Sequence, residues 1–319
     1  MKTSRLVAGL AVLGCMLAAG ACEAQAQAWP TKTVTIVYGT APGGPIDLIS
    51  RVIAAQWEKK FNQRVVVESR PGASSTVAAA YLARAAGDGH TLLNGAFPPV
   101  GIFIKELGFD PFKDITPVSI VAVQSYYLLA SKHMNISSLK DFIAYAKSNP
   151  GKVSVGIVPS GPHETESYAM LETLGIQANL IPYRGLATVY PALVSGELNA
   201  TLGTTPPQLR SGEIVGLAIG SPKRDPDFPN IPTFRESGFQ YEPQASFPFF
   251  APGTTPRELV NRISAEVAAA AKSEDFANRI TKSLHIEGWG PDPDTAAKYL
   301  REEYDKQKRI AERVGIKPQ

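Results

Sequence analysis

The chain has 319 residues, 44% hydrophobic and 19% charged, which is long enough for a packed core and predicts two domains. Its 27 glycines and 26 prolines follow no short repeat, which excludes a collagen-like or low-complexity chain. The formal net charge of +3, without a block of like charges, excludes the strongly basic surface of a nucleic-acid-binding protein. Both cysteines, Cys15 and Cys22, lie in the first 22 residues, so any thiol chemistry depends on that segment.

The first segment is typical of a signal peptide. Lys2 and Arg5 precede an uncharged run from Leu6 to Ala19, which is too short to span a membrane as a helix. Small residues predict cleavage near Ala28. Cys22 offers an alternative as the acylated residue of a lipoprotein, although the usual leucine three positions before it is missing. Cleavage near Ala28 leaves an exported chain without cysteine, and therefore without a disulfide, a thiol nucleophile or a cysteine-bound metal.

The first part of the mature chain alternates strands and helices. Short β-branched runs predict the strands, and apolar residues at helical spacing or alanine-rich stretches predict the helices. In chain order these are a strand over 33–38, a helix from Pro45 to Trp57, a strand over 64–68, a helix over 76–86 and a strand over 91–95. This order predicts an α/β domain with a largely parallel sheet.

The same alternation returns after residue 137. Ser138 is predicted to cap a helix, with Asp141 three positions on, and Gly175 to end a later one. The predicted elements are strands over 152–157, 180–181, 198–202 and 214–219, and helices starting at Ser138 and over 163–174. They predict a second α/β unit.

The last part of the chain is helical. Thr255 is predicted to cap one helix, with Pro256 in its first turn, and Asp294 to open the final one. Because these helices have no strands of their own to cover, we expect them to pack on the first domain. The chain then crosses between domains twice, near Val123–Tyr127 and near Phe247–Ala251. The predicted division is a signal peptide over 1–28, a first domain over 29–124 plus 250–319, and a second domain over 125–249.

Five blocks in order resemble the Bug-type extracytoplasmic solute receptors, the periplasmic binding proteins of tripartite tricarboxylate transporters. The resemblance covers residues 29 to about 315. The blocks are Gly39–Gly44 (GTAPGG), Glu68–Ala73 (ESRPGA), Gly87–Leu93 (GDGHTLL), Pro182–Gly185 (PYRG) and Phe250–Pro256 (FAPGTTP).

The resemblance implies a type II-like periplasmic binding protein fold, with two α/β domains of mostly parallel strands and a ligand cleft that closes between them. It implies an organic carboxylate as the solute and the membrane subunits of a tripartite transporter as partners. It implies no reaction and no cofactor. We expect a periplasmic monomer that binds neither nucleic acid nor metal.

The candidate ligand residues of the first domain lie mainly in glycine-rich or hydroxyl-rich turns before helices, where free N–H groups and the helix dipole favour an anion. The first turn is not a phosphate loop, because no Gly-Lys-Ser/Thr follows it. An ordinary loop between a strand and a helix would have the same sequence pattern as a ligand-binding turn. Asp47 either compensates the helix dipole or makes a polar contact in the cleft. A hydroxyl of the second turn either binds the solute or caps the helix. The candidates are Tyr38, Thr40, Ala41, Pro42, Gly43, Asp47, Ser74, Ser75, Thr76 and Phe97.

The candidates of the second domain are Ser160, Gly161, His163, Arg184 and Thr204. We expect His163, at a helix start, to be neutral and to donate one N–H. Arg184 is either a bidentate carboxylate ligand or a solvated loop residue. Many members of the family carry an aspartate where this chain has Gly203–Pro206, and its absence favours a plain mono- or dicarboxylate over an amino acid.

Aromatic residues bear on the shape of the ligand. An aromatic-lined cleft favours a flat diacid such as terephthalate, whereas aromatic residues packed in the core leave an aliphatic carboxylate as the expected class. Those at predicted cleft or hinge segments are Phe97, Tyr126, Tyr127, Phe247, Phe249 and Phe250.

Two other functions are alternatives to solute transport. A sensor subunit for a membrane signalling protein would use the same binding chemistry, and the sequence does not separate the two. An exported hydrolase needs a nucleophile and a base, but no G-x-S-x-G motif occurs, and His163 and Glu164 lack the H-E-x-x-H spacing of a metal site.

Overall fold

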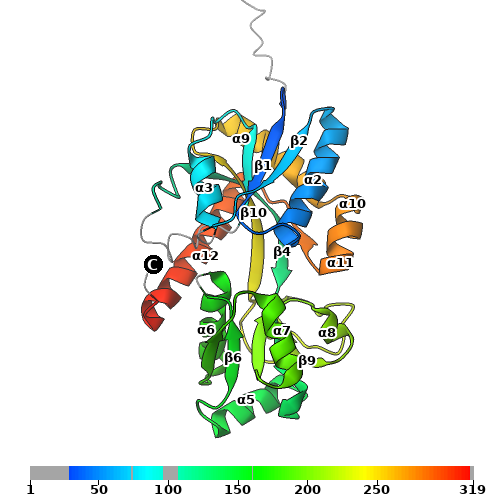
Figure 1. Cartoon of the computed structure of the whole chain (residues 1–319), viewed down its shortest axis with the longest axis vertical. Helices are drawn as coiled ribbons and strands as arrows, with labels where there is room; N and C mark the ends of the chain where they lie inside the picture. Colours follow the sequence, from blue (N-terminus) through cyan, green and yellow to red (C-terminus); the bar gives the residue numbers. More distant parts are fainter. Residues whose placement is uncertain (1–28, 73–74, 96–106, 160, 317–319) are drawn as a thin grey trace, which may run out of the picture.

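Two lobes, each built on its own sheet, lie end to end in the molecule (Figure 1). The structure is a computed structural model that describes residues 29–72, 75–95, 107–159 and 161–316. The first lobe holds the sheet with strand order β11-β4-β10-β3-β1-β2, and the second holds the sheet with order β7-β6-β8-β5-β9. No helix in the described part of the chain combines the length and the apolar character needed to cross a bilayer.

The first lobe is assembled from both ends of the chain. Its strands are β1 (Val34–Tyr38), β2 (Val65–Ser69), β3 (Thr91–Asn94), β4 (Ile115–Ser125), β10 (Gln244–Pro252) and β11 (Glu287–Gly288). Its helices are α2 (Pro45–Phe61), α3 (Thr76–Ala83), α9 (Arg257–Ala271), α10 (Glu274–Phe276), η3 (Ala277–Thr281), α11 (Lys282–Leu284) and the first half of α12 (Pro293–Val314). The expected strand–helix alternation up to residue 95 is confirmed.

The second lobe is formed by the middle of the chain. Its strands are β5 (Tyr127–Ser131), β6 (Ser154–Ile157), β7 (Asn179–Pro182), β8 (Ala200–Gly203) and β9 (Ile214–Ile219). Its helices are η2 (Lys132–Met134), α5 (Leu139–Ser148), α6 (Pro162–Leu174), α7 (Leu186–Ser195) and α8 (Pro207–Arg210). The predicted α/β unit is therefore present, and the two-lobed α/β fold is the one expected.

Both sheets are mixed, which corrects the expectation of mostly parallel strands. β1 pairs in parallel with β2 and β3, and β6 pairs in parallel with β7 and β8. In contrast, β10 runs antiparallel to β3 and β4, and β5 runs antiparallel to β8 and β9. The antiparallel strands β4, β5 and β10 are those next to the points where the chain passes from one lobe to the other.

The two lobes are joined at the ends of β4 and β10, which lie side by side. β4 ends at Ser125 and β5 begins at Tyr127, so the outward crossing falls within the expected Val123–Tyr127. β10 pairs with β4 from Gln244 onward, so the first sheet extends a few residues before the expected return crossing at Phe247–Ala251. The assignment of 125–249 to a separate domain stays a prediction.

Helix ends follow the expected cap chemistry in some places and not in others. Ser138 Oγ accepts a hydrogen bond from Asp141 N–H at 3.1 Å, and Gly175 ends α6 with φ 61°, as predicted. Thr255 does not cap α9: Pro256 takes that position, and the buried Thr255 hydroxyl has no partner among the described atoms. The final helix is capped by Asp292, two residues before the predicted start.

Helix α12 packs on both lobes, which differs from the expectation that the last helices cover the first domain alone. Its first half places Ala296 and Leu300 in a hydrophobic cluster of the first lobe. Its second half places Ile310 in the core of the second lobe, and the helix lies beside α6 in Figure 1. The sequence period shows an apolar stripe on a helix, but it does not show which lobe each part of the stripe faces.

Candidate functional site

A cavity of about 500 Å³ lies between the lobes, next to the two crossings. The first lobe supplies Pro45 from the start of α2, Gln124 from β4 and Ala245 from β10, while α7, α8 and the loop before α8 supply the opposite wall. None of the described lining residues carries a charge. They are Pro45, Gln124, Tyr126, Leu186, Ala187, Tyr190, Thr204, Pro206, Pro207, Gln208 and Ala245. A mostly apolar wall with a few neutral polar groups is typical of a small-molecule site.

The turn before α2 is arranged largely by Asp47. Its buried carboxylate accepts from Gly43 N–H at 2.9 Å and from Arg51 Nε at 2.8 Å, and it is bonded to the Tyr38 hydroxyl. Burial alone would raise the pKa of Asp47, but these hydrogen bonds and the Arg51 charge lower it. The same burial and the Asp47 bond raise the pKa of Tyr38. These contacts hold the Asp47 carboxylate within the first lobe, and its two interpretations, dipole compensation and a polar contact in the cleft, both stay predictions.

The turns before α2 and α3 lie in direct contact. A Cβ added to Gly39 would come within 2.3 Å of Ser75 Cβ, so only glycine fits there. Ser75 is buried and adopts the left-handed conformation with φ 74°, which residues other than glycine, asparagine and aspartate seldom adopt. Ser69 Oγ also donates to Thr40 O at 2.7 Å. This packing brings the two candidate turns of the first lobe to one place.

Thr76 carries an unpaired polar atom in the same place. Its side-chain hydroxyl is buried and has no partner among the described atoms, and Thr76 is the first residue of α3. Ser75 caps α3 without a side-chain hydrogen bond. The described hydroxyls of this turn therefore do not cap the helix, which leaves them as candidate donors to a solute.

His163 is held by two backbone groups of the second lobe. Its Nδ1 accepts from Val158 N–H at 3.0 Å, and its Nε2 lies 2.8 Å from Leu202 O, to which it donates. Burial lowers the pKa of His163, so the side chain is neutral as expected. Since the backbone takes both ring nitrogens, His163 positions the loop before α6 and has no ring nitrogen free for a solute.

Of the remaining ligand residues predicted from the sequence, some line the cavity and others lie outside its wall. Thr204 lines the cavity, and its N–H and Oγ both lie 3.2 Å from Tyr190 Oη. Arg184 is exposed in the loop before α7, and Gly161 forms the N-cap of α6. Ala41, Pro42 and Gly43 are exposed in the turn before α2. Ser74, Phe97 and Ser160 lie outside the described residues.

The aromatic candidates separate into one wall residue and several core residues. Tyr126 lines the cavity. Phe247, Phe249 and Phe250 are buried in the core of the first lobe, and Tyr127 is buried in the second. Side chains along β10 point alternately to the two faces of the sheet. Because helices cover both faces, the phenylalanines on either face are buried.

Most of the cavity wall was not predicted from the sequence. Leu186, Ala187 and Tyr190 follow the recognised PYRG block directly, and Pro206–Gln208 follow Gly203–Thr205. Continuing each loop into the first turn of the next helix would have found them, because helix starts at the end of a sheet face the ligand.

We expect Tyr190→Phe to weaken solute binding and to reduce stability by about 1 kcal/mol, since it removes the hydroxyl that pairs with Thr204 N–H and leaves a polar group unsatisfied. Tyr183→Phe is the matched control, because Tyr183 precedes the same helix but does not line the cavity. Thermal unfolding with and without solute measures both effects. Equal behaviour of the two variants would contradict the role given to Tyr190.

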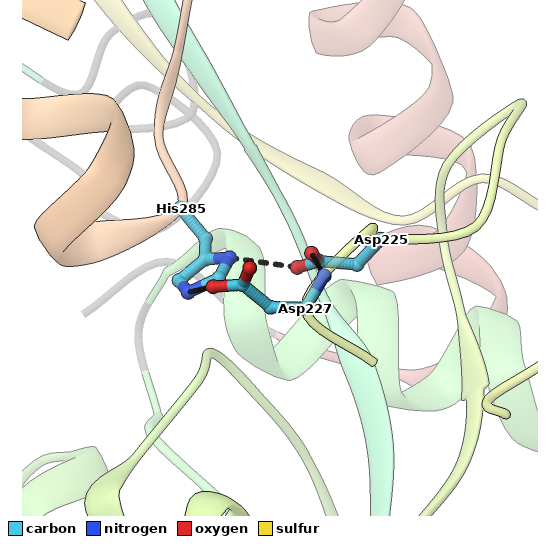
Figure 2. A group of neighbouring side chains, drawn as sticks. All are labelled: Asp225, Asp227 and His285. Atoms are coloured by element: carbon cyan, nitrogen blue, oxygen red, sulfur yellow. Dashed lines mark hydrogen bonds and ion pairs between the residues drawn. The ribbon is translucent and has the colours of Figure 1, made fainter. Parts of the chain in front are cut away.

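One further cluster lies beside the cavity. Asp225, Asp227 and His285 place their side-chain ligand atoms within 4.8 Å of one another, in the manner of a metal site (Figure 2). The Arg210 guanidinium, however, contacts His285 Nε2 and pairs with Asp227 at 3.3 Å. The Arg210 cation therefore offsets part of the negative charge of the two carboxylates.

The sequence is similar to those of known proteins along nearly its whole length. The chain is 29% identical over 318 residues to a protein encoded in the gbd 5' region of Cupriavidus necator, with 98% of this chain and 95% of that protein covered. It is 27% identical to BugT of Bordetella pertussis, with 99% of each chain covered.

Solved structures show the same architecture. The R. palustris protein Rpa4515 with adipate superposes with a TM-score of 0.78 at 29% identity, covering 92% of this chain and all of that one (100%). The periplasmic binding protein BugD gives 0.75 at 25% identity, covering 91% of this chain and 100% of that one. MatC of Rhodopseudomonas palustris with bound malate gives 0.72 at 29% identity, covering 88% of this chain and 99% of that one.

The family model described as "Tripartite tricarboxylate transporter family receptor" matches residues 49–316, which is most of the chain. These receptors are non-enzymatic solute-binding proteins of the periplasm. The chain therefore belongs to the tripartite tricarboxylate transporter family of receptors.

Proposed function

We propose that this receptor captures a small organic carboxylate between its lobes and delivers it to the membrane subunits of a tripartite transporter. The cavity between the lobes carries the proposal, because it adjoins the start of α2, and the turn before α2 packs against the turn before α3. The proposal also includes export by a signal peptide cleaved near Ala28, and a monomeric receptor.

The proposed solute has an apolar body between its polar ends. Tyr126, Tyr190 and Leu186 give the cavity an aromatic and aliphatic wall, which suits a methylene chain or a flat ring. Free N–H groups and hydroxyls of the turns before α2 and α3 are the proposed partners of one carboxylate. Arg184, exposed beside the opposite wall, is the proposed partner of a second carboxylate.

The adipate and malate held by the two R. palustris proteins are dicarboxylates of this kind, which supports the class. Terephthalate has the same two charges on a ring. The lobes are proposed to close on the solute and so to present a closed form to the transporter.

Calorimetry with adipate, malate, terephthalate and benzoate tests the proposal. We expect at least one diacid to bind, and to stabilise the fold by about 2.7 kcal/mol at 100 times its dissociation constant. Ala187→Asp adds a negative charge to the cavity wall and should abolish this binding through repulsion.

Ala144→Asp is the matched control, since Ala144 is exposed on α5 and does not line the cavity. Folded protein that binds none of the four acids would contradict the proposed function. Equal binding by the two aspartate variants would instead move the site away from this cavity.

A further inference from the structure

A histidine of the first lobe is held by charged groups of the second. His285 follows α11, and its Nδ1 lies 2.7 Å from Asp225 Oδ2 while its Nε2 lies 3.4 Å from Asp227 Oδ2. Both aspartates belong to the loop after β9, and Arg210 closes the group from the end of α8. Figure 2 shows the imidazole pointing from its own loop toward the two carboxylates. The contact therefore joins the lobes beside the outward crossing, through side chains that do not belong to the crossing strands.

The hydrogen-bond directions in this group are consistent. Because a guanidinium only donates, His285 Nε2 accepts from Arg210, and Nδ1–H is left to donate to Asp225. Asp225 also accepts from Tyr127 Oη at 2.5 Å, which fixes the carboxylate to β5. The centroid of the Phe228 ring lies 5.8 Å from that of the imidazole, with the two ring planes tilted by 42°. Every polar atom of the imidazole thus has a partner from the second lobe.

The backbone of His285 is adapted to this position. The residue has φ 53°, in the left-handed region, and its N–H donates to Thr281 O at 2.9 Å. This conformation ends α11 and turns the side chain toward the second lobe. Glycine and asparagine adopt the same conformation readily, so they replace the side chain without changing the backbone preference.

Two residues of the cavity wall are connected to this contact. Gln124 Nε2 donates to the carbonyl oxygen of Leu284, the residue before His285, at 2.8 Å. Gln208 lies in the same short helix as Arg210. Both glutamines line the cavity, one from each lobe. The His285 contact therefore holds the two elements that carry them.

We propose that His285 is a positioning residue of the solute site: it fixes the second lobe against the first and keeps Gln124 and Gln208 at the distance that a solute spans. The effect on binding rests on the proposed function, whereas the effect on the lobes does not. Removing the contact should broaden the range of distances between the lobes. It should also weaken binding about tenfold, which lies within the usual range for coupled sites.

Spin labels on the two lobes test the first effect. Ala55 of α2 and Ala144 of α5 are exposed, and both become label sites as cysteines in a full chain that carries Cys15→Ser and Cys22→Ser. Distances from pulsed electron paramagnetic resonance are compared for wild type, His285→Gly and His285→Asn. Calorimetry with adipate and terephthalate on the same proteins tests the second effect.

We expect His285→Gly to broaden the distance distribution and to weaken binding, and His285→Asn, which keeps one N–H donor for Asp225, to recover much of both. Arg257→Ala is the control, because it removes an exposed ion pair with Asp294 inside the first lobe. It should change neither readout.

A His285→Gly variant with the distances of wild type would overturn the proposal, as would an asparagine variant as impaired as the glycine variant. If wild type binds none of adipate, malate, terephthalate and benzoate, the calorimetry counts against the proposed function and the distances alone decide the role of His285. Should His285→Gly fail to fold, Arg210→Ala replaces it, since that exposed side chain contacts Nε2 from the other lobe. Unchanged distances in Arg210→Ala would then overturn the proposal.

Discussion

Replacing Lys306 with methionine is expected to reduce the free energy of unfolding by about 3 kcal/mol, a large effect for one substitution. Lys306 Nζ of α12 lies 2.6 Å from Glu166 Oε1 of α6, and the Glu166 side chain is only 1% exposed. Without Lys306 the Glu166 carboxylate stays buried with the Tyr241 hydroxyl as its remaining described partner. Leaving one member of a buried ion pair uncompensated accounts for the cost.

The same substitution should have a characteristic pH dependence. Burial raises the pKa of Glu166 even beside Lys306, and removing the lysine charge should raise it further. A carboxyl with a higher pKa in the folded state binds protons that the unfolded chain releases. Stability is then retained at acidic pH and lost as pH rises through the folded-state pKa. The loss caused by Lys306→Met should therefore be smaller in acid than at neutral pH.

Urea unfolding at acidic and at neutral pH measures the loss of stability in Lys306→Met. Lys308→Met is the matched control on the same helix. Lys308 lies 3.9 Å from Glu312, and both side chains are more than half exposed, at 52% and 66%. The control should change stability by less than about 0.5 kcal/mol. Similar losses for the two variants, or a loss for Lys306→Met that does not depend on pH, would contradict the role of the buried pair.

Replacing Gly39 with alanine is expected to abolish solute binding and to reduce stability by about 1–3 kcal/mol. The new Cβ would meet Ser75 at 2.3 Å from its Cβ and 2.5 Å from its Cα. Because the Cα atom belongs to the backbone, a change of rotamer does not relieve the clash, and the turns before α2 and α3 must separate. Their N–H groups and hydroxyls would then no longer converge on one carboxylate.

Gly44→Ala is the control for this effect, since it lies in the same turn and its added Cβ would be 3.9 Å from the nearest atom, Ala41 O. Calorimetry and thermal unfolding compare the two variants. The double variant Gly39→Ala/Ser75→Gly removes the clash with the serine side chain but leaves the clash with the backbone of residue 75, so it should recover part of the stability. Full binding by Gly39→Ala would show that the close packing of the turns does not matter for the solute.

Local patterns in the sequence predicted the parts of the fold that depend on neighbouring residues. The β-branched run ending at Tyr38 became β1, and the Ser138 cap and the Gly175 stop are where the pattern placed them. Such features depend on side-chain periodicity and on hydrogen bonds within a few positions. The direction of a strand within its sheet does not depend on such local features. For this reason the sequence did not indicate that β10 runs antiparallel to its neighbours in the middle of its sheet.

The candidate site was predicted only in part, for a similar reason. The resemblance located the turns before α2 and α3, whose contact at Gly39 and Ser75 the structure shows. It did not indicate that Gln124, Tyr190 and Gln208 face one cavity, since these residues meet only through the arrangement of the lobes. His163 has the residue type of a ligand but supports the backbone, which only its two partners reveal.

Helix α12 has a consequence for how the lobes can move. It has 22 residues and is therefore about 33 Å long, and it is fixed to the first lobe by its start and to the second by Lys306 and Ile310. A rod fastened to two bodies resists any motion that changes its length or bends it, but it resists rotation about its own axis much less. The lobes should therefore twist past one another around α12, so that the cavity opens by shear along its walls.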